Sequence, residues 1–347
     1  MGRQHTTSDA AGATSAPRMK AVVQRAYGSA DTLELVEVDS PEIGPTEVLV
    51  EVWAAGVDRG VWHIMTGLPY LVRIMGYGLR RPKTAVLGFD LSGRVVAVGA
   101  EVERFEVGDE VFGIGRGSFA EYAVADESKL VAKPTGITHA EAAVAAISGT
   151  TAVQAVTDVG RLEPGQTVLV IGASGGVGSY AVQLAKALGG TVTGVARGAK
   201  AGFVQDLGAD YVIDYTKTDY LDGASRYDLI VDAGGGNPVR KLRRALTRHG
   251  TLVIVGAEGG GRWTGGVGRS LRAFILSPMV PQRLTSFIAK EGHEHIARVA
   301  EYLRTGEMVA AVGERFELAD AAEALRRLEA GTTSGKSVII VKADHES

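Results

Sequence analysis

The chain has 347 residues, of which 45% are hydrophobic and 22% charged, and its formal net charge at pH 7 is -3. This length favours two domains, and the near-neutral charge gives no reason to expect nucleic acid or a membrane as a partner. The absence of cysteine excludes disulfides and thiolate metal ligands and fits a reducing compartment, so the expected location is cytoplasmic.

Residues 1–18 are small and polar and lack the apolar run of a signal peptide, so we expect a disordered tail there. From there to about residue 148, short β-branched runs alternate with turns, and no apolar stretch reaches the roughly 18–20 residues that span a bilayer. This spacing predicts a β-rich, partly barrel-like domain with strands at Lys20–Gln24, Thr32–Val38, Val48–Ala55, Gly93–Val98, Glu110–Ile114 and Phe119–Ala125.

After residue 148 strands alternate with helices, which predicts a doubly wound parallel α/β sheet with right-handed crossovers. The predicted strands are Thr167–Ile171, Thr191–Val195, Tyr211–Ile213, Leu229–Asp232 and Thr251–Val255. From about Glu291 the pattern is mixed again, with helices at Glu294–Thr305 and Ala319–Ala330 and strands around Phe316 and at Ser337–Val341.

A glycine-rich loop lies between the first of these strands and a helix that continues to Leu188. Glycines at this place allow a tight turn, let backbone amides approach a pyrophosphate and let the helix lie close to the sheet. The helix start presents unpaired N–H groups and a positive dipole end to an anion. A flexible turn is the alternative, but the strand–loop–helix order predicts a dinucleotide site at Gly172, Ala173, Ser174, Gly175, Gly176, Val177 and Gly178.

The residues after the second strand decide which dinucleotide is expected. An NAD site usually has an acidic residue there, which binds the ribose hydroxyls. Here Arg197 and Lys200 follow the strand instead. Two cations suit a 2′-phosphate, although solvated charges on a helix surface would look the same in the sequence. NADPH is therefore the expected cofactor.

Several further motifs follow one another between Met19 and Lys342. They include Met19-Lys20-Ala21-Val22-Val23, Ala54-Ala55-Gly56-Val57, Gly88-Phe89-Asp90-Leu91-Ser92-Gly93, Gly117-Ser118-Phe119-Ala120-Glu121-Tyr122 and Ser148-Gly149-Thr150-Thr151-Ala152. In this order they resemble the medium-chain dehydrogenase/reductase superfamily, and most closely its zinc-free quinone oxidoreductase branch. The resemblance implies a Rossmann doubly wound parallel sheet inserted in a GroES-like β-rich barrel domain. It places the barrel at 19–148, the NADP-binding domain at 149–290 and the return to the barrel at 291–345, with the active site between the domains.

Zinc-dependent members of the superfamily carry a Cys soon after the Ala-Ala-Gly-Val segment, and a Gly-His-Glu where this chain has Gly88-Phe89-Asp90. Both ligands are absent, as are the four cysteines of a structural zinc, and the seven His residues include no HExxH-like pair. The resemblance therefore implies no metal. It implies hydride transfer from NADPH to a small hydrophobic electrophile, a quinone or an α,β-unsaturated carbonyl.

The resemblance also points to two polar side chains for the substrate cleft. Asp58 stands where quinone oxidoreductases often have an Asn, and it could face the nicotinamide or the substrate; a loop or cap residue is the alternative. Tyr70 lies where the branch tends to place a cleft tyrosine, and its phenol could donate to a carbonyl oxygen. A half-buried packing tyrosine is the alternative for Tyr70, and water could supply the proton.

For the cofactor, the resemblance implies that Thr150 or Thr151 lies near the nicotinamide and that Lys200 and Tyr215 bind the 2′-phosphate. It also implies cofactor contacts for Gly234 and Gly256, which follow the fourth and fifth strands, and for Lys336, which precedes the last strand.

The segment Gly259–Gln282 is expected to form either a lid near the cleft or a dimer contact beside an edge strand at Leu284–Ile288. The resemblance implies a homodimer joined through the outer strands of two Rossmann sheets. An NADPH-dependent, zinc-free reductase of quinones or enones is the preferred function. A metal-free carbonyl or alcohol dehydrogenase and a non-catalytic NADPH-binding protein remain as alternatives, because fold alone does not decide among them.

Overall fold

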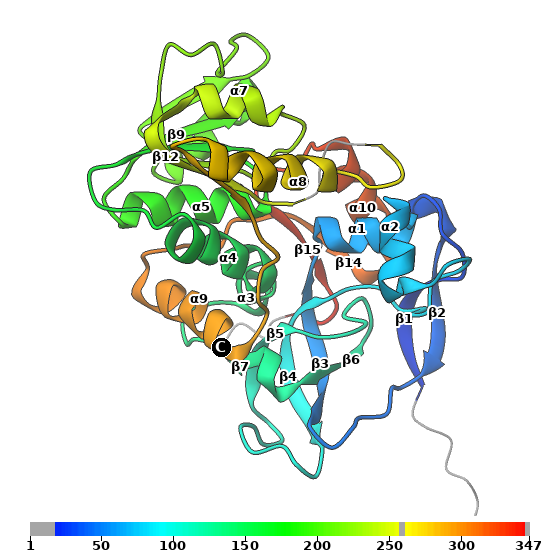
Figure 1. Cartoon of the computed structure of the whole chain (residues 1–347). Helices are drawn as coiled ribbons and strands as arrows, with labels where there is room; N and C mark the ends of the chain where they lie inside the picture. Colours follow the sequence, from blue (N-terminus) through cyan, green and yellow to red (C-terminus); the bar gives the residue numbers. More distant parts are fainter. Residues whose placement is uncertain (1–17, 257–260, 344–347) are drawn as a thin grey trace, which may run out of the picture.

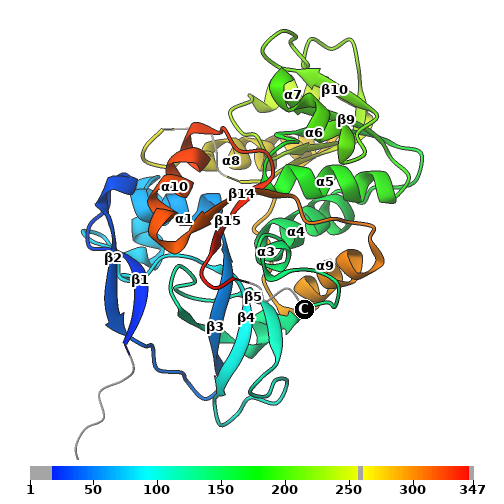
Figure 2. The same ribbon diagram turned by 180° about the vertical axis from the view of Figure 1, so that it is seen from behind.

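The computed structural model describes residues 18–256 and 261–343. These residues form two parts, which Figures 1 and 2 show from opposite sides: a β-rich part, which includes the last strands of the chain, and an α/β part from the middle of the sequence. The tail predicted for residues 1–18 lies outside the described residues except for Arg18, which begins the first strand.

The β-rich part is built, among the described residues, from a seven-stranded sheet and a separate ribbon of β1 and β2. The sheet has the order β14-β15-β3-β4-β5-β7, with β6 paired to β3. β3 is buried on alternate residues at its start and on both faces at its end, so it runs through the centre of the core. The strands are β1 Arg18–Gln24, β2 Leu33–Asp39, β3 Glu47–Gly56, β4 Asp90–Val98, β5 Glu110–Ile114, β6 Tyr122–Asp126, β7 Leu130–Ala132, β14 Val312–Glu317 and β15 Lys336–Ile340.

One predicted strand is displaced. Phe119–Ala125 was expected to be extended throughout, but β6 begins only at Tyr122. Phe119 and Ala120 lie in the preceding loop, where the Phe119 carbonyl accepts a hydrogen bond from Val22 N and Ala120 bridges to Ala21 of β1. The apolar run therefore packs against the ribbon before it joins the sheet.

The α/β part contains a six-stranded parallel sheet in the described residues, ordered β10-β9-β8-β11-β12-β13. Numbered along the chain this is the order 3-2-1-4-5-6 of a Rossmann fold. The strands are β8 Thr167–Ile171, β9 Thr191–Ala196, β10 Tyr211–Asp214, β11 Tyr227–Asp232, β12 Leu246–Ile254 and β13 Arg283–Ser286; the helices are α5 Gly176–Ala187, α6 Ala201–Asp206, α7 Val239–Arg244 and α8 Val267–Leu276. The edge strand β13 overlaps the edge strand predicted at Leu284–Ile288 but begins and ends earlier.

The remaining helices connect the two parts or pack on the barrel sheet (Figure 1). They are α1 Arg59–Thr66, α2 Tyr70–Val72, α3 His139–Ala143, α4 Ala146–Val153, α9 His293–Thr305 and α10 Ala321–Ala330. The chain returns to the barrel sheet with β14, before α10, and again with β15, whose Val338 pairs with Gly56 of β3. The predicted fold class, a Rossmann sheet combined with a GroES-like barrel sheet, is confirmed; the domain limits at 148 and 290 stay a prediction.

Candidate active site

The glycine loop forms the turn between β8 and α5. Gly172 has a φ of 80°, a left-handed conformation that favours glycine. A Cβ on Gly178 would lie 2.1 Å from the carbonyl oxygen of Gly172, so only glycine lets α5 approach the sheet end this closely. Gly175 is the N-cap of α5 and has no side chain to accept a hydrogen bond from the first turn. The N–H groups of that turn therefore remain available to bind an anion.

Gly178→Ala is expected to lower the free energy of unfolding by about 1–3 kcal/mol, because the new methyl group overlaps backbone. Gly202→Ala is the matched control: it also replaces a helical glycine, but a Cβ there meets nothing within 4 Å, and it should be neutral or slightly stabilising. Urea unfolding of both variants measures the difference. Similar losses in the two variants would show that the contact between α5 and β8 is not tight.

A cavity of about 600 Å³ extends from this loop across the carboxyl ends of β8, β9 and β11. This is the edge of a Rossmann sheet where dinucleotides bind. Its other wall comes from the barrel part, from the start of α1 and the turn before β15. Twelve residues predicted from the sequence line it: Asp58, Gly172, Ser174, Gly175, Gly176, Val177, Gly178, Arg197, Lys200, Tyr215, Gly234 and Lys336.

Five predicted residues do not line this cavity. Ala173 is wholly buried within the glycine loop. Thr150 is buried in α4, and its hydroxyl has no hydrogen-bond partner among the described residues. Thr151 donates to the Ile147 carbonyl at 2.7 Å, within its own helix. Gly256 lies beyond β12 with a φ of 82°. Tyr70 packs edge-on against Trp263 with ring centroids 5.2 Å apart. The structure thus brings most of the predicted cofactor residues together, but it leaves Thr150, Thr151 and Gly256 outside the lining of the cavity and places Tyr70 in a contact away from it.

One end of the cavity is basic. Arg197 Nε donates to the Tyr215 hydroxyl at 2.8 Å, and this bond raises the pKa of Arg197. Lys200 Nζ donates to the carbonyls of Gly331 and Thr333 at 2.9 and 2.6 Å, while burial and the neighbouring Arg197 lower its pKa. Lys200 therefore connects the loop after α10 to the α/β part by hydrogen bonds, and it also contributes positive charge to this end of the cavity.

The opposite end holds a buried pair that sequence reasoning missed. Lys336 Nζ contacts the carboxylate of Asp90, and both side chains are almost wholly buried. Asp90 also accepts a hydrogen bond from Ile147 N at 3.0 Å. Burial, with a smaller contribution from the nearby Asp58, raises the pKa of Asp90 to about 7, although Lys336 and the Ile147 N–H act to lower it. The pair anchors Lys336 beside the glycine loop.

Asp58 lines the same cavity as Lys336 and lies near Asp90. Its Oδ1 accepts a hydrogen bond from Val61 N at 3.2 Å and so caps α1, while Oδ2 is buried without a partner among the described residues. Asp58 is thus a helix cap, as the alternative reading allowed, and a wall of the cavity at the same time.

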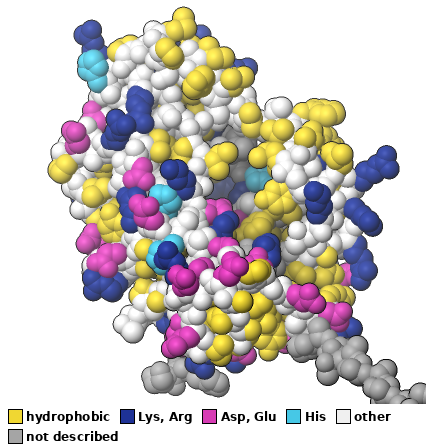
Figure 3. Space-filling view, turned by 60° about the horizontal axis from the view of Figure 1, so that its bottom comes forward, with side chains coloured by type: hydrophobic (Ala, Val, Ile, Leu, Met, Phe, Trp, Pro, Cys, Tyr) yellow, Lys and Arg dark blue, Asp and Glu magenta, His cyan; other side chains and the backbone are white. Residues whose placement is uncertain are grey.

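A second cavity of about 530 Å³ meets the first. Asp58, Gly60 and Ile147 line both cavities, which therefore join at the start of α1. The rest of the second cavity is lined largely by apolar residues and glycines, but it also holds Arg116, Lys129 and Glu291. His63 is a further polar group, and its Nδ1 lies 2.7 Å from the Leu68 carbonyl. Figure 3 shows the hollow between the two parts, with hydrophobic side chains on both sides of it.

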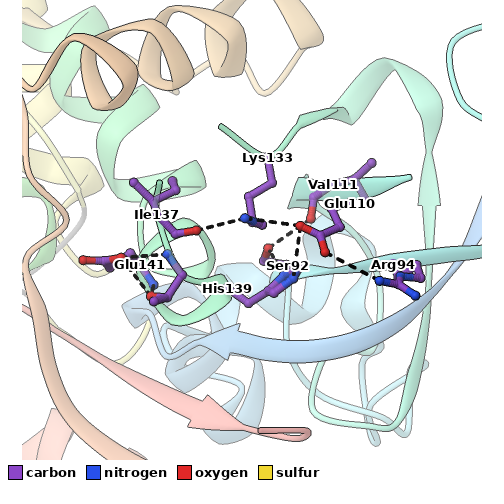
Figure 4. A network of polar contacts seen from close by, with 9 residues as sticks. Ser92, Arg94, Glu110, Val111, Lys133, Ile137, His139 and Glu141 are labelled. Carbon is purple, nitrogen blue, oxygen red and sulfur yellow. Dashed lines mark hydrogen bonds and ion pairs between the residues drawn. The ribbon is translucent and has the colours of Figure 1, made fainter. Parts of the chain in front are cut away.

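A further polar network lies away from both cavities (Figure 4). Ser92 Oγ is 2.8 Å from His139 Nδ1, and His139 Nε2 is 3.8 Å from Glu110 Oε2, an order that resembles a catalytic triad. The Ser92 hydroxyl is wholly buried and lies 3.0 Å from the Val111 carbonyl, to which it donates. Neither cavity is lined by Ser92, His139 or Glu110, so a substrate in these cavities would not contact the Ser92 hydroxyl. We therefore interpret the network as a structural link between β4, β5 and α3.

Glu110 makes this network sensitive to acid. Burial acts to raise its pKa, but Lys133, His139 and Arg94 together hold the pKa below its ordinary value of 4.5. A lowered pKa means that the ionised carboxylate stabilises the fold above pH 4.5, and that this contribution is lost as pH falls through the lower folded value. Between about pH 6 and pH 3, Glu110→Gln should therefore lose less stability than the wild type. Unfolding temperatures across this range test it, with the exposed Glu42→Gln as control; parallel curves for Glu110→Gln and wild type would refute it.

The residues that the structure describes contain no group of three or more His, Asp or Glu side chains arranged to hold a metal ion. No helix among those residues is long and apolar enough to cross a membrane.

Comparison with known proteins agrees with this architecture. Residues 44–135 match the family model described as an alcohol dehydrogenase GroES-like domain, and residues 207–339 match the one described as a zinc-binding dehydrogenase. A chloroplastic quinone oxidoreductase from Triphysaria versicolor is 32% identical over 343 residues, covering 92% of this chain and 98% of that protein. A 2-methylene-furan-3-one reductase from Solanum lycopersicum is 28% identical over 337 residues, covering 92% of this chain and 79% of that protein.

Solved structures show the same likeness. The quinone oxidoreductase from Coxiella burnetii superposes with a TM-score of 0.83 at 25% identity, over 94% of this chain and 100% of that chain. A mycobacterial protein solved with NADPH superposes with a TM-score of 0.77 at 26% identity, over 93% and 100%. The chain is an NAD(P)H oxidoreductase by this similarity and belongs to the medium-chain dehydrogenase/reductase superfamily, in its quinone oxidoreductase-like branch.

Proposed function

We propose that this protein is a zinc-independent, NADPH-dependent reductase of quinones or α,β-unsaturated carbonyls. The observation that carries the proposal is the junction of the two cavities at Asp58, Gly60 and Ile147. The first cavity, which would hold the dinucleotide, ends at these residues, and the second cavity begins at them. A hydride donor in the first cavity and a hydrophobic electrophile in the second would meet at this point.

The residues present fit a nicotinamide dinucleotide phosphate. A Cβ on Gly176 would lie 2.9 Å from Ser148 Oγ, so the cradle at the start of α5 depends on glycine. Arg197, Lys200 and Tyr215 supply cations and a hydroxyl at the far end, which is the chemistry that a 2′-phosphate requires. These contacts support NADPH over NADH.

When bound, the cofactor supplies a hydride from its nicotinamide ring. The glycine loop binds the pyrophosphate, and the Asp90–Lys336 pair holds the turn before β15 against the glycine loop. Leu87, Phe89 and Ile114 line the second cavity with apolar surface, which favours a hydrophobic electrophile. Zinc independence is supported by the lack of any cysteine and by Phe89 at the place where zinc-dependent relatives have a histidine.

The test is NADPH oxidation with 1,4-benzoquinone, 9,10-phenanthrenequinone and a 2-alkenal, on protein whose metal content has been measured. We expect turnover with at least one of them and no bound zinc. Binding of NADPH without turnover of any would favour a non-catalytic cofactor-binding protein, and stoichiometric zinc would refute the metal-free mechanism.

The cytoplasm is the proposed location. We also propose a homodimer joined through β13, which lies at the edge of the parallel sheet in the described residues. Light scattering in solution tests the second proposal, because a monomer at all concentrations would refute it.

A further inference from the structure

Helix α8 carries its apolar stripe on the outside. Val267, Leu271, Phe274 and Ile275 follow one another at helical spacing, and all four are exposed, with 77% of Phe274 accessible. The buried side of the helix holds Ala273 and Arg269, whose guanidinium bonds Asp232 at 2.9 Å. A surface helix of a globular protein normally packs such a stripe against the core. An exposed stripe of this kind marks a surface that binds a membrane or another protein.

A second apolar segment adjoins the approach to this helix. Ile74, Met75 and Leu79, which follow α2, are more than half exposed. The Tyr70 and Leu71 N–H groups donate to the carbonyls of Arg262 and Trp263 at 2.8 and 3.1 Å, so the segment before α8 is fastened to α2. Figure 1 shows α8 running toward α1 and α2. We call the combined surface the docking face: Ile74, Met75, Leu79, Trp263, Val267, Leu271, Phe274 and Ile275.

The two stretches of sequence that carry the docking face have formal charges of one sign. Residues 59–89 and 261–290 contain no Asp or Glu, although the chain as a whole has 40 acidic residues and a net charge of -3. Glu258 precedes the second stretch and lies outside the described residues. The two stretches contain ten basic residues, of which those exposed near the docking face are Arg80, Arg81, Lys83, Arg262 and Arg272. The near-neutral total hides this segregation.

We propose that the docking face binds the surface of an anionic lipid bilayer. Interfacial helices combine an apolar stripe of Phe, Leu and Ile with flanking Arg and Lys, and each cation near an anionic leaflet adds to the binding. A second copy of the chain fits less well, because a two-fold contact through this face would set the same cations against each other. The sequence-based expectation of no membrane partner rested on the small net charge and on the lack of an apolar stretch long enough to span a bilayer. Neither observation tests binding to the surface of a membrane.

The docking face also lies beside the second cavity. Val72 and Tyr77, which line that cavity, flank the exposed Ile74 and Met75. A molecule with a long apolar tail could therefore pass from the bilayer to the junction of the cavities. This part rests on the proposed function: it makes the substrate a lipid-soluble quinone or enone that partitions into the membrane.

The experiment is flotation of the full chain, loaded with NADPH, on vesicles of phosphatidylcholine with phosphatidylglycerol and on pure phosphatidylcholine. Wild type should float with the anionic vesicles and be released by high salt. Phe274→Ser/Ile275→Ser and Arg80→Ala/Arg81→Ala should each lower the ratio of bound to free protein about tenfold or more. Val107→Ser and Arg248→Ala, at exposed positions elsewhere, are the matched controls and should bind like wild type.

Unchanged NADPH affinity and unfolding temperature will show that the variants are folded. Equal binding to neutral vesicles, no binding of wild type, or full binding by both double variants would overturn the proposal. The proposal would also be overturned if wild type does not bind the vesicles and light scattering shows that Phe274→Ser/Ile275→Ser converts a dimer into a monomer. In that case the docking face would be a contact between two copies of the chain. Because flotation needs no substrate, it can succeed even if quinone reduction fails, and the two proposals are judged separately.

Discussion

Replacing Arg197 by alanine is expected to raise the Kd for NADPH about 10- to 100-fold and to leave the Kd for NADH nearly unchanged. The reason is that a hydrogen bond to a charged group contributes about 1.5–3 kcal/mol, and a 2′-phosphate is present only in NADPH. Lys200→Ala should weaken NADPH similarly. It should also weaken NADH by a few-fold, because Lys200 holds the carbonyls of Gly331 and Thr333, which lie beside the same cavity.

Titration of both dinucleotides by fluorescence or calorimetry measures these constants. Lys217→Ala is the matched control, since it removes a nearby exposed cation that does not line the cavity. The affinity for NADPH should fall with added salt in wild type more steeply than in Arg197→Ala. Equal losses for NADPH and NADH in Arg197→Ala would remove the assignment of a 2′-phosphate site at this end.

Asp90→Ala should have the largest effect on stability of any single change considered, a loss of about 3–5 kcal/mol in the free energy of unfolding. The substitution leaves the Lys336 ammonium buried without its partner and takes the acceptor away from the Ile147 N–H. Replacing both members, as Asp90→Leu/Lys336→Met, should recover most of the loss, because a packed apolar pair avoids burying charge.

Urea unfolding of the single and double variants tests this coupling. The double variant should bind NADPH more weakly than wild type even though it is folded, since Lys336 lines the cavity. A loss of less than about 1 kcal/mol in Asp90→Ala, or no recovery in the double variant, would mean that the pair is not the anchor described above.

Local patterns were enough to predict much of the fold. The alternation of strands and helices after residue 148 predicts the Rossmann sheet, because buried parallel strands and amphipathic helices each leave a short-range period in the sequence. The glycine loop could be placed for the same reason: Gly172 and Gly178 are needed within a few residues of each other. The segment before β13 also carries a helical period, in Val267, Leu271, Phe274 and Ile275, but from the sequence we interpreted it as a lid or a dimer contact and did not predict the helix.

The inner end of the site depends on contacts that local patterns do not contain. Asp90 and Lys336 are 246 residues apart, and their pairing is decided by the return of β15 to the barrel sheet. The family resemblance placed Tyr70 in the substrate cleft because of its position in the sequence. Its position is set instead by the docking of α2 against Arg262 and Trp263, a contact between the two halves. Sequence reasoning named Lys336, but it had no signal for the acid that Lys336 contacts.

The most direct test of the central claim, hydride transfer at the junction of the two cavities, uses NADPH deuterated at the nicotinamide C4 position. The enzyme is freed of metal and allowed to reduce an α,β-unsaturated ketone, and the product is examined by NMR. The account predicts one deuterium at the β-carbon, delivered from one face of the nicotinamide, and no requirement for added zinc. Oxidation of NADPH without deuterium at that carbon, or turnover only after zinc is added, would contradict it.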